Sequence, residues 1–162
     1  MSAAVRTGIG YDSHRFTPGR PLIIGGVEIP EAEQGLAGHS DGDVLTHALM
    51  DALLGAAGLE DIGAHFPDTD ERWRGADSIA LFGELCRLAA DAGWSIANLD
   101  VTVVCERPRL GPRREAMRSR LAEAAGLGVE DVSVKFTTNE GMGFVGRGEG
   151  IAALAVCTLA GR

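Results

Sequence analysis

Histidines and aspartates gather in the first third of this sequence, where three of the four histidines lie. Asp12 and His14 are two positions apart in a stretch, residues 5–16, that reads as a strand. Side chains so spaced on a strand point to the same face. A carboxylate oxygen beside an imidazole nitrogen forms a pair of ligands that zinc accepts. The same pair is also typical of the polar end of an ordinary strand.

Another histidine lies in the strongly helical segment 43–57, DVLTHALMDALLGAA, which Gly58 ends. Asp43, His47 and Asp51 recur every four residues, so they form one polar stripe on an otherwise apolar helix. Such a helix is normally buried. A buried histidine then needs polar partners, because unpaired buried polar groups are costly.

His47 is therefore either a satisfied core histidine or a metal ligand. The D-x-H pair favours the second interpretation. Asp12, His14 and His47 would supply three ligands and leave a fourth position open, as catalytic zinc sites do. Asp43 or Asp51 could then orient an imidazole through its other nitrogen.

The motif HSDGD, residues 39–43, precedes this helix. Its local interpretation is a capping box in which Ser40 caps the helix and Asp43 takes the third helical position. His39 would then lie just outside the helix N-terminus. Amide hydrogens and the helix dipole favour a phosphate group at such a place.

The glycine-rich stretch TTNEGMGFVGRGEG, residues 137–150, contains a formal match to the dinucleotide motif GxGxxG. We reject a dinucleotide site, because too few residues follow Gly146 for the helix, strand and acidic residue that it requires. A turn between two strands would explain the glycines. It would not explain hydroxyls and a guanidinium that suit phosphate oxygens, or a carboxylate that suits magnesium. These side chains are Thr137, Thr138, Arg147 and Glu140.

The segment CERPRLGP, residues 105–112, ends one predicted strand and opens a helix at Pro112. As a plain strand-to-helix loop it needs no function. As a nucleotide site it would offer backbone groups and two arginines.

The remaining elements follow from periodicity and turn residues. Extended segments are expected at 5–16, 21–29, 98–105, 131–138 and 150–159. Helices are expected at 43–57, at 77–92 and from Pro112 onward, with polar loops at 30–42 and 59–75. Strands alternate with helices, which predicts an α/β fold (an α+β sandwich) with a mixed β-sheet covered by helices. Without repeats or linkers, residues 1–162 read as a single domain.

Composition narrows the class of protein. The 162 residues are 45% hydrophobic and 23% charged, which is typical of a globular domain. A net charge of −8 argues against binding to nucleic acid or to an anionic membrane. The apolar stretches are too short to span a bilayer, and the N-terminus lacks a signal-peptide pattern. We therefore expect a cytoplasmic protein.

The cysteines and the charge carry two further expectations. Cys86, Cys105 and Cys157 are far apart and in no C-x-x-C spacing, which argues against a disulfide framework or a zinc ribbon. An acidic chain that binds a polyphosphate needs local cations, and bound metal is the obvious source.

Taken together, the motifs resemble one family, the 2-C-methyl-D-erythritol 2,4-cyclodiphosphate synthases of the non-mevalonate isoprenoid pathway. The matching pieces run in order along essentially the whole chain. They are GYDSHRF, PLIIGGVEIP, HSDGDVLTHALMDALLGAAGLEDIG, HFPDTD, GADS, DVTVVCERPRLGP, VKFTTNEGMGF and GRGEG. One motif alone would be weak, whereas the ordered set is specific.

The resemblance implies a lyase that uses divalent metal. It implies zinc on Asp12, His14 and His47, and magnesium or manganese held with the help of Glu140. It makes His39 and Thr138 the catalytic groups that polarise the reacting phosphorus.

The resemblance also implies a substrate site of many contacts. Those toward the metal, the phosphates and the erythritol are Asp12, Ser13, His14, His39, Ser40, Asp61, Ile62, Gly63, Phe66, Pro67, Asp68, Thr69 and Asp70. Those toward the cytidine and the diphosphate are Cys105, Glu106, Arg107, Pro108, Arg109, Leu110, Gly111, Thr137, Thr138, Asn139, Glu140, Phe144 and Arg147.

The family is a homotrimer with active sites between subunits. Phe144, Arg147 and Glu149 would approach the trimer axis, where some members hold an isoprenoid diphosphate. The chain departs from the family at Arg109, where lysine is common, and in TTNEGMGF, which replaces the common TTTEKLGF. An arginine presents a planar fork in place of a point charge.

The implied reaction converts 4-diphosphocytidyl-2-C-methyl-D-erythritol 2-phosphate to 2-C-methyl-D-erythritol 2,4-cyclodiphosphate. The substrate's own 2-phosphate attacks the β-phosphorus, and CMP leaves. Two alternatives stay open, a metal-bound isoprenoid-binding trimer and a metallophosphohydrolase. Release of CMP without orthophosphate would separate all three.

Overall fold

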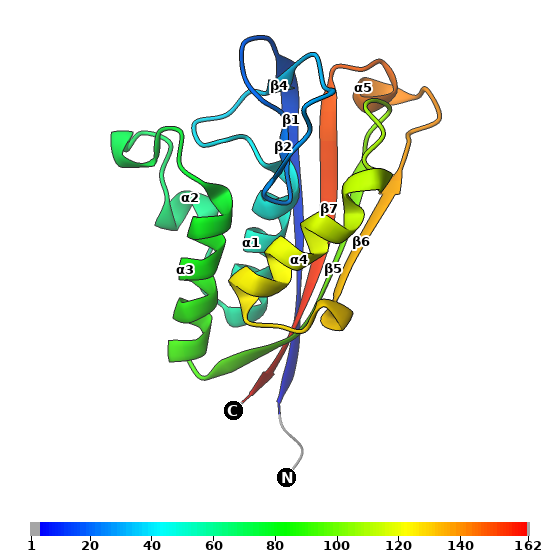
Figure 1. Cartoon of the computed structure of the whole chain (residues 1–162). Coiled ribbons are helices and arrows are strands. Elements are labelled where there is room, and N and C mark those ends of the chain that lie inside the picture. The colour runs from blue at the N-terminus through cyan, green and yellow to red at the C-terminus, as the bar shows by residue number, and fades with distance from the viewer. Residues whose placement is uncertain (1–3, 162) are drawn as a thin grey trace.

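The two ends of the chain pair at the centre of a five-stranded mixed sheet in the computed structural model, which describes residues 4–161 (Figure 1). Its strands are β1 (Val5–Thr17), β4 (Gly35–Leu36), β5 (Trp94–Val104), β6 (Val132–Thr137) and β7 (Gly150–Gly161). The strand order is β4-β1-β7-β5-β6. β5 and β6 are parallel and the other neighbours are antiparallel, which confirms the predicted mixed sheet.

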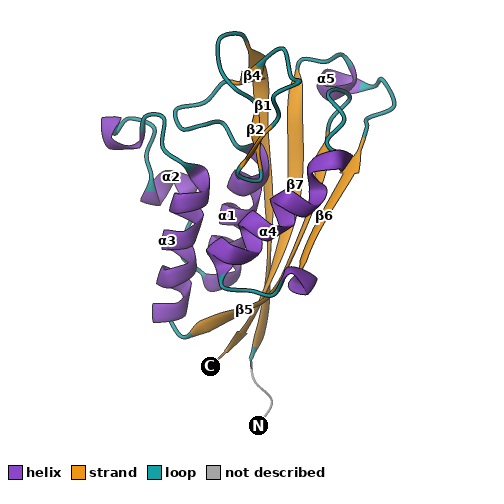
Figure 2. Cartoon of the chain, in the orientation of Figure 1, coloured by secondary structure: helices purple, strands orange, loops and turns teal. Residues whose placement is uncertain are grey.

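Three long helices cover one face of this sheet (Figure 2). They are α1 (Val44–Ala57), α3 (Ser78–Asp91) and α4 (Arg114–Ala125). Shorter helices and 3₁₀ turns lie at α2 (Ile62–His65), α5 (Gly143–Gly146), Glu71–Trp73, Gly111–Arg113 and Val129–Asp131. The predicted α/β architecture is therefore confirmed. Residues 1–3 and 162, which the single-domain prediction includes, lie outside the described residues.

Three local predictions are wrong. Residues 30–42, expected as a loop, contain β4, which pairs with β1. Residues 21–29 do not form one extended segment but a hairpin of β2 (Ile23–Ile24) and β3 (Val27–Glu28). Gly25 and Gly26 make its turn with positive φ angles of 58° and 70°, which glycine adopts without strain. Residues 59–75 are also more than a polar loop, because they contain α2 and the turn at Glu71–Trp73.

Two glycines let β1 lie directly against α1. A Cβ atom at Gly8 or Gly10 would lie 2.0 or 1.9 Å from a carbonyl oxygen of α1, so no other residue fits there without displacing the helix. Successive side chains of a strand alternate between faces. The even-numbered positions of β1 therefore face α1, and Asp12 and His14 continue that face beyond the glycines.

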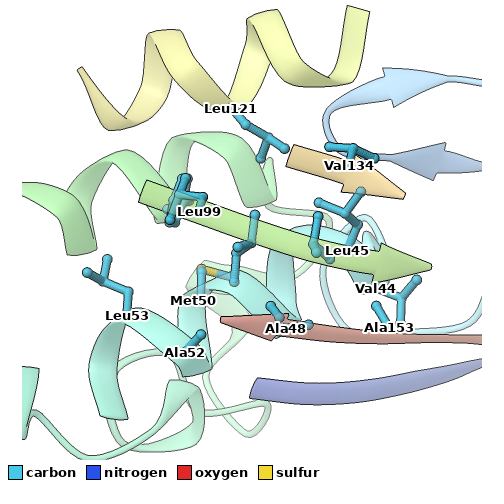
Figure 3. Packing of buried hydrophobic residues seen from close by; sticks show 14 of the residues in the cluster. Val44, Leu45, Ala48, Met50, Ala52, Leu53, Leu99, Leu121, Val134 and Ala153 are labelled. Atoms are coloured by element: carbon cyan, nitrogen blue, oxygen red, sulfur yellow. The ribbon is translucent and has the colours of Figure 1, made fainter. Parts of the chain in front are cut away.

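Apolar side chains of α1 fill the space between the sheet and the other helices (Figure 3). Leu45 and Met50 pack in one cluster with Leu99 of β5, Leu121 of α4 and Val134 of β6, and each exposes at most 3% of its surface. Burying a side chain of this kind contributes about 1.5–3 kcal/mol to folding. This cluster holds α1 in place relative to β1.

The other face of the sheet carries exposed apolar side chains. Ile9, Tyr11 and Leu154 are 72%, 54% and 43% exposed, and Tyr11 lies directly opposite Leu154 in the β1–β7 ladder. The three long helices all lie on the opposite side of the sheet (Figure 1). Within residues 4–161, no helix combines the length and apolar character needed to cross a bilayer.

Candidate metal centre and substrate site

Three predicted metal ligands converge at the junction of β1 and α1. The Asp12 Oδ2 atom lies 2.8 Å from His14 Nε2 and 3.1 Å from His47 Nδ1. The two imidazole nitrogens are 3.1 Å apart. All three residues are partly buried.

This arrangement fits a divalent metal. Tetrahedral zinc with bonds of about 2.0–2.1 Å separates its ligand atoms by about 3.3 Å, close to the spacing here. Two ring nitrogens and a carboxylate oxygen that point at one another also need a positive charge between them. A set of three protein ligands, here Asp/His/His, is typical of catalytic rather than structural zinc.

The proximity of these groups shifts the pKa values of Asp12 and His14. Burial alone would raise the pKa of Asp12, but hydrogen bonds from His14 and His47 and the charges of both outweigh it and lower the pKa to about 2. Burial also opposes a charged His14, yet the hydrogen bond and charge of Asp12 raise its pKa above 6.5. The ligand set thus favours a positive charge at its centre.

The second nitrogen of each imidazole is also occupied. His14 Nδ1 bonds to the carbonyl oxygen of Ala37. His47 Nε2 lies 2.9 Å from Ser78 Oγ and 3.1 Å from Ser40 Oγ. Both rings therefore present their remaining nitrogen to the metal position.

The prediction that Asp43 or Asp51 orients an imidazole is wrong. Asp43 is fully buried, and its carboxylate accepts hydrogen bonds from the Gly25, Gly26 and Thr46 amides and from the Thr46 hydroxyl. Asp51 instead accepts the Ile62 amide at 3.0 Å. A four-residue spacing aligns side chains along a helix, but tertiary contacts turn each of these carboxylates elsewhere.

The capping-box prediction is also wrong. Asp43 itself caps α1, and its side chain accepts the Thr46 amide. The Ser40 hydroxyl lies beside His47 instead. The helix starts one residue later than predicted, because the side chain of Asp43 supplies the cap.

The predicted phosphate loop lies next to the metal ligands. Arg20 donates to the Gly38 carbonyl at 2.7 Å and also to the Ser40 carbonyl, which ties this loop to the start of the hairpin. His39 Nε2 contacts the Asp70 carbonyl at 3.0 Å. His39 thus joins the predicted erythritol loop, residues 66–70, to the loop that carries Ser40.

The predicted segment 61–63 lies along α1. Asp61 caps α2 by accepting the Ala64 amide, and Asp51 holds the next residue, Ile62. Burial raises the pKa of Asp51, and the charges of Asp61 and Asp12 add to the effect. The metal ligands, the phosphate loop and this segment therefore form one group, on β1 and α1 and in the loops next to them.

The predicted cytidine and diphosphate residues form a second group at the ends of β5 and β6. Glu106 Oε1 accepts the Asn139 amide at 2.8 Å and the Gly141 amide at 3.4 Å, so it ties the two loops together. A hollow of about 550 Å³ lies between the loops. It is lined by Cys105, Glu106, Pro108, Arg109, Leu110, Gly111, Pro112, Arg114, Phe136, Thr137 and Thr138.

Phe144 and Arg147 belong to a third place, around α5. Arg147 donates to Glu149 at 2.8 Å. Phe144 and Glu149 share a hollow of about 190 Å³ with Ser13 and the neighbouring residues of β1. Ser13 lies at an odd position of β1, so it points away from the metal ligands.

The first two groups do not meet within one chain. β7 lies between β1 and the β5–β6 pair (Figure 1). Within residues 4–161, no side-chain hydrogen bond or ion pair joins the metal group to the second group. One chain thus holds the two halves of the predicted site at separate places.

Sequence reasoning missed three residues that shape the metal side. Arg20 ties down the phosphate loop, and Asp41 and Ser78 contact each other and lead to His47. The motifs HSDGD and GADS contain Asp41 and Ser78, but nothing in their spacing indicates that they touch.

Known proteins resemble the chain over nearly its whole length. A 2-C-methyl-D-erythritol 2,4-cyclodiphosphate synthase of Symbiobacterium thermophilum is 59% identical over 96% of this chain and 98% of its own length. The bifunctional enzyme IspD/IspF of Anaeromyxobacter dehalogenans is 57% identical over 98% of this chain, which spans only 41% of that relative.

A solved structure agrees with these relatives. A CDP-bound 2C-methyl-D-erythritol-2,4-cyclodiphosphate synthase superposes with a TM-score of 0.86 at 42% identity, over 95% of this chain and 99% of its own. The YgbB family matches residues 5–160. The resemblance inferred from the motifs is confirmed, and the chain belongs to the YgbB family.

Proposed function

We propose that the chain converts 4-diphosphocytidyl-2-C-methyl-D-erythritol 2-phosphate to 2-C-methyl-D-erythritol 2,4-cyclodiphosphate and releases CMP. One observation carries the proposal, the convergence of Asp12, His14 and His47 ligand atoms in a member of the YgbB family. The relative from Symbiobacterium bears the name of this synthase and matches the chain almost end to end.

Two metal sites follow from the proposal. Asp12, His14 and His47 would hold zinc, and Glu140 would help hold magnesium or manganese against the diphosphate. Such ions offset anionic charge and polarise a phosphoryl centre when bound. Glu140 lies in an exposed turn, and its backbone amide donates to the Thr138 hydroxyl. Among the described residues, its carboxylate has no side-chain partner.

The chain's main contribution is to position the substrate. Two phosphate groups must approach each other, and at ~4 Å and an effective dielectric constant near 20 each pair of unit charges repels by about 4 kcal/mol. Holding the nucleophile next to the phosphorus can lower the barrier by up to ~7–11 kcal/mol. We assign three polar groups to the reacting phosphates. His39 and Ser40 come from the loop beside the metal ligands, and Thr138 comes from the loop after β6.

The two loop groups account for the rest of the substrate. We assign the cytidine to the hollow between residues 105–111 and 137–138, whose volume of about 550 Å³ suits a nucleoside. The CDP-bound relative supports a cytidine nucleotide as the ligand. We assign the erythritol to residues 61–63 and 66–70, which lie next to the metal ligands.

We further propose that three copies assemble and share their active sites. The separation of the metal group from the cytidine group supports sharing, since one chain cannot close both around one substrate. The exposed apolar face of Ile9, Tyr11 and Leu154 offers a surface for such an assembly. The proposal also includes an isoprenoid diphosphate bound near Phe144, Arg147 and Glu149. It further includes a cytoplasmic location.

The decisive experiment measures products. Purified chain with zinc and magnesium should release CMP from the substrate without orthophosphate, measured by chromatography and ³¹P NMR. His47→Ala should abolish both zinc binding and CMP release. His65→Ala is a matched control for zinc binding, because His65 bonds the Leu59 carbonyl and lies against the Phe66 ring, away from the metal ligands, and this variant should keep its zinc. Orthophosphate as a product would indicate a metallophosphohydrolase, and absence of turnover a binding protein.

A further inference from the structure

A short hydrogen-bonded chain leads from the buried start of α3 to the metal ligand His47. Ser78 is fully buried, and its hydroxyl lies 2.9 Å from His47 Nε2. The same hydroxyl donates to Asp41 Oδ1 at 2.5 Å, and the Ser78 amide donates to Asp41 Oδ2 at 3.0 Å. Asp41 also accepts the Asp43 amide at 3.1 Å, so it is fixed to the start of α1 as well.

The proton positions in this series of hydrogen bonds follow from which of its groups can donate and which can only accept. An ionised carboxylate only accepts hydrogen bonds, so the Ser78 hydroxyl proton must point to Asp41. Ser78 Oγ then offers a lone pair to His47 Nε2. This contact matches a ring that carries its proton on Nε2 and presents the lone pair of Nδ1 to a metal bound beside Asp12 and His14.

Helix capping does not explain this serine. Asp77 is the N-cap of α3 and accepts the Ile79 amide at 2.9 Å. The Ser78 amide is satisfied by Asp41. The Ser78 hydroxyl is therefore free of any role in starting the helix, and both of its contacts belong to the chain between Asp41 and His47.

Ser40 also contacts His47, but it cannot determine which nitrogen of the ring carries the proton. Its hydroxyl reaches His47 Nε2, at 3.1 Å, but Ser40 is only half-buried, in the phosphate loop. No carboxylate among residues 4–161 fixes the direction of its proton, since its other contact is an amide donor, Gly42. A hydroxyl that is free to rotate can donate to Nε2 as easily as accept from it, so it selects neither tautomer.

We propose that Ser78, held by Asp41, is a positioning residue that fixes the ring orientation and tautomer of His47 and so strengthens divalent-metal binding. This inference rests on the metal centre of the proposed function. Partners that orient a ligating histidine typically change metal affinity by about 10–100-fold. We expect Ser78→Ala to weaken zinc binding by a factor in that range.

Zinc affinity provides the main test, measured by competition with a chromophoric chelator. Ser78→Ala should lose about 10–100-fold, and Ser78→Thr, which keeps the hydroxyl, should restore most of the loss. Asp77→Ala is the matched control, because it removes a cap from the same helix without touching His47. Its zinc affinity should equal that of the wild type. Equal affinities of Ser78→Ala and wild type would overturn the proposal.

Asp41→Ala provides a second test. Without the carboxylate, the Ser78 hydroxyl loses the acceptor that fixes its proton, so it can turn that proton toward His47 Nε2. Zinc affinity should therefore fall by about 10–100-fold, as in Ser78→Ala. The double variant Ser78→Ala/Asp41→Ala should bind zinc about as weakly as each single variant, because Asp41 acts through Ser78. An unchanged zinc affinity in Asp41→Ala would overturn the proposal.

The two experiments separate this inference from the proposed function. If Ser78→Ala does not fold, which circular dichroism will reveal, the zinc affinity of Asp41→Ala decides. A wild-type protein that binds zinc as expected but releases no CMP would refute the proposed function and leave the role of Ser78 intact. Normal CMP release together with an unchanged zinc affinity in Ser78→Ala would refute only the role of Ser78.

Discussion

Replacing Asp43 with alanine should destabilise the fold far more than the loss of an ordinary helix cap. The carboxylate is fully buried and accepts four hydrogen bonds, from Gly25 N at 2.9 Å, Gly26 N at 2.7 Å, Thr46 N at 3.1 Å and Thr46 Oγ at 2.8 Å. It therefore caps α1 and fastens the β2–β3 turn to that helix at the same time. Alanine would leave these donors in the interior without an acceptor.

The expected loss follows from counting those donors. The Thr46 hydroxyl can rotate toward another acceptor, whereas the three amides are fixed by the backbone. Each buried donor left without a partner costs about 1–3 kcal/mol, so the amides alone predict a loss of about 3 kcal/mol or more. In a chain of this length, a loss of about 3 kcal/mol corresponds to a fall in Tm of about 6–12 °C.

Urea unfolding followed by circular dichroism measures this loss directly. All proteins must be compared at one concentration, because assembly would stabilise the folded state by mass action. Asp77→Ala is the matched control, since Asp77 is an exposed N-cap whose side chain accepts a single amide in the cap. Its loss should be about 1 kcal/mol. Similar losses in the two variants would refute the reasoning that Asp43 acts as more than a cap.

Three further predictions concern the pH dependence of stability, zinc binding and the assembly. The raised pKa of His14 stabilises the metal-free protein fully below pH 6.5, and this stability declines as pH rises through the folded-state pKa. The lowered pKa of Asp12 contributes above pH 3.8 and is lost as pH falls toward 2. Zinc affinity should instead rise with pH above 6.5, because proton and metal compete for His14, and a zinc Kd that does not change over that range would contradict this. For the assembly, equal mixtures of His47→Ala and Thr138→Ala trimers, dissociated and reassociated, should recover roughly a quarter of wild-type activity if each site spans a head-to-tail interface. Verified mixed trimers without activity would place the site within one chain.

The metal ligands could be predicted from sequence because two simple periodicities determine their placement. Alternation along β1 puts Asp12 and His14 on one face, and the apolar pattern of α1 buries the side that carries His47. Two glycines on the same face of β1 then bring the helix close. No long-range information is needed beyond the packing of one strand on one helix.

The partners of those ligands could not be predicted in the same way. Asp41 and Ser78 are far apart in sequence and meet only because the starts of α1 and α3 lie side by side. The four-residue stripe suggested Asp43 and Asp51 instead, since local spacing is the only proximity that a sequence displays. The hairpin at Gly25–Gly26 was missed for a related reason, because strands of two residues are too short to show a period.

β1 links the metal centre to the proposed assembly through its alternation. Its even positions carry Gly8, Gly10, Asp12 and His14 toward α1, and its odd positions carry Ile9 and Tyr11 to the uncovered face. A shift of one residue would exchange the two faces, so the ligands would leave the metal position and bulky side chains would collide with α1. The eleven paired positions between β1 and β7, from Val5 to Arg15, oppose such a shift. The same strand register therefore fixes both where the metal ligands lie and which surface is left for another copy of the chain.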